Sequence, residues 1–278
     1  MRRIRSLLAA VALAGAPVVA AAQAAAPLVL GQTYQLPSRA LGETRRINVF
    51  AARGYDPDTT KPLPVVYMPD GGMGEDFLHV AGLLAIGAMN GTTRPVLLVG
   101  IENTQRRRDL TPPTESAEDR KVAPVVGGSA RMRDFIRDEL KPFIAARYPV
   151  TRESAIVGES LAGLFVVETF LLEPALFDTY IAIDPSLWWN DAKLVDGAGE
   201  RLRGRATAGK SLWLASSSEW DIAAQTARLA STLQRGRFPG LTWHHEPMPG
   251  EGHGTIYHPA ALRAFRTVLA PPPAPAGR

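Results

Sequence analysis

Short apolar runs alternate with amphipathic stretches along most of the chain. Apolar runs of about four to eight residues are typical of strands buried on both faces of a sheet, and the intervening segments show helical periodicity. The predicted strands are residues 45–52, 63–69, 94–101, 154–158, 180–184, 211–217 and 241–248. The predicted helices are residues 75–90, 129–148, the stretch after Ser160, a stretch that ends near 205, 222–236 and 258–270. This alternation predicts an α/β fold with a mostly parallel central sheet and helices on both faces.

Two segments depart from the alternation. Residues 102–128 are polar and contain prolines, so we expect a long loop there. Residues 271–278 are rich in proline and alanine and are expected to form a disordered tail. Because no linker-like segment interrupts residues 27–270, we expect them to form one domain.

The first 24 residues have the pattern of a secretory signal peptide. Arginines at the start are followed by an apolar run and then by the small-residue site Ala22-Gln23-Ala24. An uncleaved anchor is the alternative, but the run contains Gly15 and Pro17 and is short for a membrane span of about 20 residues. We therefore expect an exported protein, periplasmic or extracellular, with no stable membrane anchor after cleavage.

Charge and cysteine content exclude several functional classes. The formal net charge is +4, from 31 basic and 27 acidic residues. Three of the arginines lie in the predicted signal peptide, which leaves 28 basic against 27 acidic residues and a charge of +1. The basic character is therefore no evidence for nucleic-acid binding. The chain has no cysteine, which excludes disulfides, a thiolate nucleophile and cysteine metal sites.

Ser160 lies at the junction of a predicted strand and a predicted helix. Residues 158–163, G-E-S-L-A-G, approximate the G-x-S-x-G nucleophile elbow, with Ala162 at the last small position and Gly163 one residue later. Such a corner would hold the Ser160 hydroxyl at the sheet edge and direct the Leu161 backbone N–H toward a developing oxyanion. An N-cap serine is the alternative, but the position after a buried strand favours the nucleophile.

His253 is the predicted general base. It lies in the glycine-rich segment P-G-E-G-H-G-T, between the last predicted strand and the last helix, which in this fold order ends near the serine corner. A solvated turn histidine is the alternative. The orienting acid should follow a strand between Ser160 and His253, and Glu219 stands nearest such a strand end. Asp221 is the alternative acid, although it also suits a helix N-terminus.

Further residues have positions that suit the oxyanion hole or substrate binding. Gly71 and Gly72 follow the strand 63–69, so an amide of this pair could be the second oxyanion donor, or the pair could form an ordinary turn. Arginine binds carboxylates or catecholates and stacks on aromatic rings, and tryptophans can wall an aromatic pocket. The alternatives are a solvated loop paired with Asp109 and packing of a helix. The candidate substrate-binding residues are Arg106, Arg108, Trp188 and Trp189, with Arg107 between the two arginines.

Taken together, these segments resemble the "putative esterase" family of α/β-hydrolases. That family includes esterase D-like enzymes, feruloyl esterases, mycolyltransferases and siderophore-trilactone esterases. The segments that carry the resemblance are L-P-V-V-Y-M-P-D-G-G (63–72), L-V-G-I-E-N-T-Q-R-R-R-D-L-T-P (98–112), F-I-R-D-E-L-K-P-F-I-A-A-R-Y-P-V (135–150), A-I-V-G-E-S-L-A-G-L-F (155–165), I-A-I-D-P-S-L-W-W-N (181–190) and P-G-E-G-H-G-T (249–255). In the fifth of these, Asp184 stands where serine is often found.

The resemblance implies an α/β-hydrolase fold and a serine esterase that acts on a small-molecule ester. It implies Ser160 as nucleophile, His253 as base and Glu219 or Asp221 as acid. Leu161 and an amide of the glycine pair would form the oxyanion hole, and no metal or organic cofactor is expected. An aromatic or catecholate ester, of siderophore or feruloyl type, would fit the arginines and tryptophans. An acyltransferase and a non-catalytic binding protein that keeps the fold are the alternatives, and the oligomeric state is not predicted.

Overall fold

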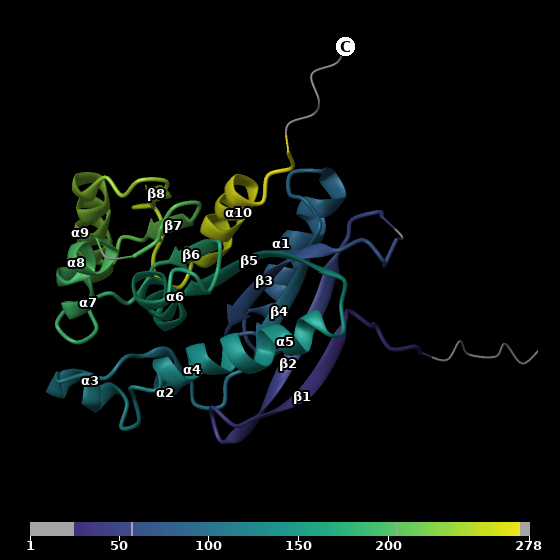
Figure 1. The fold of residues 1–278 in the computed structure, drawn as a ribbon, viewed down its shortest axis with the longest axis horizontal. Coiled ribbons are helices and arrows are strands. Elements are labelled where there is room, and N and C mark those ends of the chain that lie inside the picture. Colours follow the sequence, from purple (N-terminus) through teal and green to yellow (C-terminus); the bar gives the residue numbers. More distant parts are fainter. Residues whose placement is uncertain (1–24, 57, 204, 273–278) are drawn as a thin grey trace, which may run out of the picture. The chain divides into compact units, whose positions relative to one another are not determined.

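The computed structural model describes residues 25–272, apart from residues 57 and 204 (Figure 1). The predicted signal peptide and residues 273–278 of the predicted tail lie outside the described residues. The chain divides into two units at residue 30: residues 25–30 are exposed and without regular structure, and the sheet with its helices lies in the unit that starts at Gly31. Within the described part of the chain, no helix is long and apolar enough to cross a membrane.

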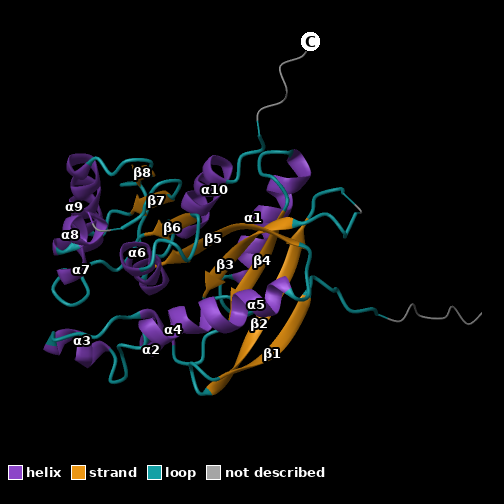
Figure 2. Ribbon diagram, in the orientation of Figure 1, coloured by secondary structure: helices purple, strands orange, loops and turns teal. Residues whose placement is uncertain are grey.

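An eight-stranded sheet forms the centre of this second unit (Figure 2). Its strands are β1 (Gln32–Ser38), β2 (Glu43–Ala52), β3 (Leu63–Pro69), β4 (Val96–Ile101), β5 (Val150–Glu159), β6 (Thr179–Ile183), β7 (Ser211–Ser216) and β8 (Thr242–Pro247). The order across the sheet is β1-β2-β4-β3-β5-β6-β7-β8, with β2 antiparallel to both neighbours and all other adjacent pairs parallel. The predicted fold class is thus confirmed, and the sheet is of the α/β-hydrolase type.

Helices cover both faces of the sheet, as the alternating pattern predicts. They are α1 (Phe77–Asn90), α2 (Arg106–Leu110), α3 (Ala117–Val122), α4 (Ser129–Phe135), the π-helical turn η1 (Ile136–Leu140), α5 (Lys141–Ala145), α6 (Leu161–Leu172), α7 (Lys193–Asp196), α8 (Ala198–Arg203), α9 (Trp220–Gly236) and α10 (Tyr257–Val268). Helices α1 and α10 bury their apolar sides in one cluster with the sheet. Helices α4, α6, α8 and α9 contribute to a second cluster, which packs against the other face.

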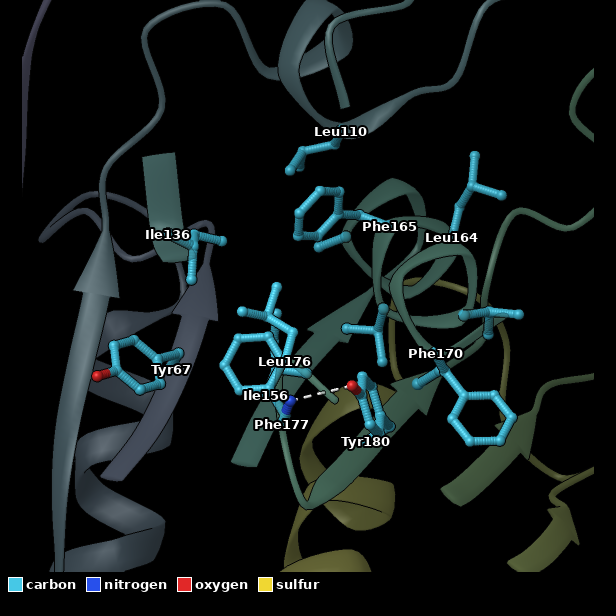
Figure 3. Close-up of a cluster of buried hydrophobic side chains, with 14 of the residues drawn as sticks. Tyr67, Leu110, Ile136, Ile156, Leu164, Phe165, Phe170, Leu176, Phe177 and Tyr180 are labelled. Carbon is cyan, nitrogen blue, oxygen red and sulfur yellow. Dashed lines mark hydrogen bonds between the residues drawn. The ribbon is translucent and has the colours of Figure 1, made fainter. Parts of the chain in front are cut away.

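Helix α6, which begins directly after Ser160, is buried along almost its whole length. Every residue from Leu161 to Leu171 is buried, because the helix packs between the sheet and neighbouring helices. Its Phe165 and Phe170 lie in a cluster with Tyr180 of β6, whose hydroxyl accepts the Phe177 backbone N–H at 3.0 Å (Figure 3). The start of α6 is therefore fixed by dense packing, which gives Ser160 a rigid support.

Three parts of the secondary structure differ from the sequence-based prediction. Strand β1 was not predicted, because most of its residues are exposed or half-buried and its sequence lacks an apolar run. The predicted loop 102–128 contains the short helices α2 and α3. The predicted helix 129–148 ends at Ala145 and passes through η1, in which the Lys141 N–H donates to the Ile136 carbonyl. Pro142 follows directly and has no N–H to donate, so the regular ladder cannot continue through it.

Candidate active site

Ser160 occupies a sharp turn between β5 and α6. Its backbone has φ 60° and ψ −120°, which is a sparsely populated conformation for a residue other than glycine. The turn is held because the Ser160 N–H donates to the Ile183 carbonyl at 3.1 Å. A Cβ at Gly158 would lie 2.6 Å from the Ala162 carbonyl carbon, so the strand and helix approach too closely for a larger residue. The local geometry is that of a nucleophile elbow.

The structure brings Ser160 and His253 together. His253 Nε2 lies 3.0 Å from Ser160 Oγ, and His253 Nδ1 lies 2.6 Å from Asp184 Oδ2. With Nδ1–H donating to the Asp184 carboxylate, Nε2 carries the lone pair that faces the serine hydroxyl. The hydrogen bond to Asp184 raises the pKa of His253 above its ordinary value, against the opposing effect of burial. This arrangement suits a histidine that takes up the serine proton.

The carboxylate at His253 is Asp184, so the predicted acid, Glu219 or Asp221, is corrected. Asp184 follows β6 directly, is fully buried, and accepts the Ser217 N–H at 2.6 Å and the Ser217 hydroxyl at 2.8 Å. Glu219 is exposed at the start of α9 and acts on His253 only as a nearby negative charge. Asp221 lies in the first turn of α9, and its Oδ1 accepts the Ile222 N–H at 2.8 Å.

Sequence reasoning missed Asp184 although one signal was present. The residue stands immediately after the apolar strand 180–183, as a triad acid should. Whether the end of β6 or of β7 lies beside His253 depends on how the strands are placed in the sheet, and an apolar run carries no such information.

Of the predicted oxyanion donors, only Leu161 is suitably placed. It begins α6, so its backbone N–H has no acceptor within the helix, and it lines the cavity at Ser160. The Gly71 N–H donates to the Ile101 carbonyl at 3.0 Å, and the Gly72 N–H donates to Glu75 Oε2 at 2.7 Å. Both glycine amides are therefore engaged in this structure, and the prediction that one of them faces the oxyanion is not supported.

A cavity of about 460 Å³ opens at the serine and the histidine. Its lining includes Arg106, Trp188 and Trp189, which the sequence analysis assigned to substrate binding. Trp188 is half-buried, whereas Trp189 is 1% exposed and its Nε1–H donates to the Pro112 carbonyl at 3.1 Å. Trp188 therefore offers the accessible aromatic surface, and Trp189 anchors the wall behind it.

The two predicted arginines have different surroundings. Arg106 lines the cavity and forms a two-point ion pair with Asp70, with Nε–Oδ1 at 2.7 Å and Nη2–Oδ2 at 2.8 Å. Arg108 pairs with Asp109 at 2.6 Å and with Glu43 at 2.9 Å, and it is not among the residues that line the cavity. The structure thus places Arg106, but not Arg108, where a substrate could meet it.

Three side chains of the site offer possible metal-ligand atoms. Atoms of Glu159, Asp184 and His253 lie within 4.8 Å of one another. The 2.6 Å separation of His253 Nδ1 from Asp184 Oδ2 is nevertheless a hydrogen-bond distance. Two ligands of one tetrahedral zinc ion, each at ~2.0 Å, would stand roughly 3.3 Å apart. The geometry therefore corresponds to a hydrogen bond between His253 and Asp184, and we assign no metal ligands here.

Comparison with known proteins gives a consistent set of relatives. The chain is 31% identical over 165 residues to the ferri-bacillibactin esterase BesA of Bacillus subtilis (strain 168), covering 53% of this chain and 56% of that protein. It is 36% identical over 151 residues to the siderophore triacetylfusarinine C esterase of Aspergillus fumigatus, covering 46% of each. The chain thus spans about half the length of the curated relatives that it matches.

Solved structures extend the similarity over more of the chain. The crystal structure of an IroE-like serine hydrolase from Shewanella oneidensis superimposes with a TM-score of 0.78 and 27% identity, covering 86% of this chain and 80% of that one. The family model described as "Putative esterase" matches residues 38–235, a range that includes Ser160 and Asp184. The resemblance seen in the sequence is confirmed, and the chain belongs to the putative esterase family.

Proposed function

We propose that the protein hydrolyses carboxylic esters through an acyl-Ser160 intermediate. One observation carries the proposal: His253 Nε2 stands 3.0 Å from Ser160 Oγ, while Nδ1 is held by Asp184 at 2.6 Å. Nε2 takes the hydroxyl proton as Oγ attacks the ester carbonyl carbon, and the same proton then passes to the leaving alcohol. Water activated by His253 attacks the acyl-enzyme, which releases the acid and restores Ser160. The buried carboxylate of Asp184 stabilises the imidazolium in both steps.

We further propose an ester of siderophore type as the substrate, with a feruloyl-type aromatic ester as the second candidate. Relatives from Aspergillus fumigatus and Emericella nidulans are named siderophore esterases, and the one from Bacillus subtilis is named a ferri-bacillibactin esterase, which supports the first. The half-buried Trp188 offers an aromatic surface at the cavity, and Arg106 offers a cation. An aromatic ring or catecholate on the acyl part could stack on the first and pair with the second.

The test compares the protein with Ser160→Ala on p-nitrophenyl acetate and butyrate. We expect turnover that falls by about 10⁴–10⁶-fold in the variant, as for removal of a triad nucleophile. Circular dichroism of both proteins controls for folding. Covalent labelling of the wild type, but not of the variant, by a fluorophosphonate would support the acyl-enzyme. If the wild type neither turns over ester nor takes the label, the corner serine is structural and a binding protein is the better explanation. Product analysis with an added alcohol separates hydrolysis from acyl transfer.

Export is proposed from the sequence alone. The N-terminal residues 1–24 have the pattern of a cleaved signal peptide. N-terminal sequencing of the protein from a periplasmic extract and from the medium would test both the cleavage after Ala24 and the final location.

A further inference from the structure

Glu159 is a second carboxylate beside His253, in addition to Asp184. It is the last residue of β5 and the neighbour of Ser160, so the strained turn fixes its position as well. Its side chain is 16% exposed, and its Oε1 lies 3.4 Å from His253 Nδ1. That separation is within ion-pair range, although the Nδ1 hydrogen bond itself goes to Asp184. The imidazole edge therefore faces two carboxylates, of which Asp184 is fully buried and Glu159 is partly exposed.

Ionisable groups from several different elements surround Glu159. The groups that act on it, or on which it acts, are His253 in the loop after β8, Asp184 after β6, Arg106 in α2, Asp70 after β3 and Tyr257 in α10. Burial raises the pKa of Glu159 to about 7, while the positive charges of His253 and Arg106 act in the opposite direction. Glu159 and His253 each shift the pKa of the other, so their titrations are coupled.

We propose that Glu159 is a positioning residue that, in its ionised form, stabilises the imidazolium of His253 alongside Asp184. The inference rests on the proposed function, because it concerns the base of that reaction. An ionised carboxylate at this distance favours the protonated histidine. The imidazolium forms each time Ser160 gives up its proton, so the same contact lowers the energy of the transition state. The proton itself stays between His253 and Ser160 or the leaving group, and Glu159 does not touch the reacting atoms.

Removal of the negative charge of Glu159 lowers the pKa of His253, so the free enzyme keeps a neutral base down to lower pH. In Glu159→Gln, the acid limb of the kcat/KM profile should move to lower pH by about one unit. A shift of that size means that the protonated ring of His253 is stabilised about tenfold less than in the wild type. On the alkaline plateau, where Glu159 is ionised in the wild type, kcat should fall by about tenfold for the same reason. A residue that only fills space would move neither.

The experiment measures these profiles for the full protein, Glu159→Gln, Glu159→Asp and Glu219→Gln. Glu219→Gln is the matched control, because it removes one negative charge that is exposed and that acts on the pKa of His253 more weakly than Glu159 does. We expect the control to move the acid limb much less than Glu159→Gln. Glu159→Asp keeps the charge and should stay nearer to the wild type. Thermal unfolding followed by circular dichroism verifies that each variant is folded.

An NMR titration of the His253 ring protons, assigned with a His253→Gln variant, gives a readout that does not need turnover. A lower imidazole pKa in Glu159→Gln than in both the wild type and Glu219→Gln supports the proposal. Equal values in the two Gln variants, or an unmoved value in Glu159→Gln, overturn it. If the wild type hydrolyses no ester, the proposed function fails, while the titration still decides whether Glu159 acts on His253.

Discussion

Asp184→Asn is the substitution that most directly tests which carboxylate supports His253. Asp184 accepts two hydrogen bonds from Ser217 and one from His253 Nδ1–H. Asparagine has the same shape but only one acceptor atom in that position. If its oxygen keeps the Ser217 N–H, its amide nitrogen faces Nδ1, and two donors then meet. The imidazole escapes this conflict by moving its proton to Nε2, which can then no longer accept the proton of Ser160.

The loss of charge adds to the loss of the correct tautomer. Opposite unit charges 2.6 Å apart attract with ~6 kcal/mol at an effective dielectric constant of 20. The ring of His253 is partly solvated, with 38% of its side chain exposed, and Glu159 remains nearby. We therefore expect a loss of about 3–5 kcal/mol in the transition state, or a fall in kcat of roughly 10²–10⁴-fold.

The assay is the steady-state hydrolysis of p-nitrophenyl butyrate by Asp184→Asn, Glu219→Gln and the wild type at one pH on the alkaline plateau. We expect Glu219→Gln to retain activity within about threefold, since an exposed charge contributes little. A large loss in Glu219→Gln together with near-normal kcat in Asp184→Asn would refute the assignment of Asp184. Unfolding curves in urea show whether the buried substitution has also reduced stability.

Three other expectations concern packing, buried charge and pH. Gly71→Ala would place a Cβ 2.3 Å from the Gly100 Cα, so we expect a loss of about 3 kcal/mol in urea unfolding from overpacking against backbone. Asp109→Asn removes the negative charge that pairs with the buried Arg45. It should lower the free energy of unfolding in urea by about 3–5 kcal/mol. Because Asp184 raises the pKa of His253 above 6.5, kcat/KM should fall as the pH drops through that raised value, with an acid limb above pH 6.5 in the wild type.

The features that the sequence predicts well are those with a local physical cause. Apolar runs place the strands β2 to β8 within a few residues, because most of these strands are buried along much of their length. Strand β8 is the exception, since its residues are exposed or half-buried. Ser160 is found because a tight corner needs small neighbours, and Gly158 does lie against the Ala162 backbone. His253 is found because its glycine-rich loop must come back to the sheet edge. In each case the requirement is visible within about ten residues of the chain.

The features that were missed depend on which segments become neighbours. Asp184 lies beside His253 because β6 pairs with β5 on one side and β7 on the other, and that order is a property of the whole sheet. The Gly71 N–H donates to the Ile101 carbonyl and the Gly72 N–H donates to the Glu75 carboxylate. No local sequence pattern predicts these hydrogen bonds. The sequence therefore predicts which residues lie at the sheet edge more reliably than it predicts which of them contact one another.

The strained corners of the sheet explain why these groups converge. Three residues other than glycine have left-handed backbones directly after parallel strands: Asp70 with φ 56°, Ser160 with φ 60° and Asp184 with φ 45°. The Ser160 N–H still bonds to the last residue of β6, and the Asp184 N–H to Ala215 of β7 at 2.9 Å. The ladder thus runs one residue past β5 and past β6 before the chain turns.

Each corner costs on the order of 1–3 kcal/mol of backbone strain, and packing of the sheet must hold it in place. What the strain achieves is the same at all three positions, because a left-handed turn at a strand end projects its side chain over the carboxyl edge. Asp70 there holds Arg106, Ser160 meets His253 Nε2, and Asp184 meets Nδ1. A fold without these corners could keep the same sheet and helices, but it would place the three side chains elsewhere. Two of the corners thus bring Ser160 and Asp184 to the two nitrogens of His253, and the third holds Arg106 at the cavity, as expected where backbone strain supports an active site.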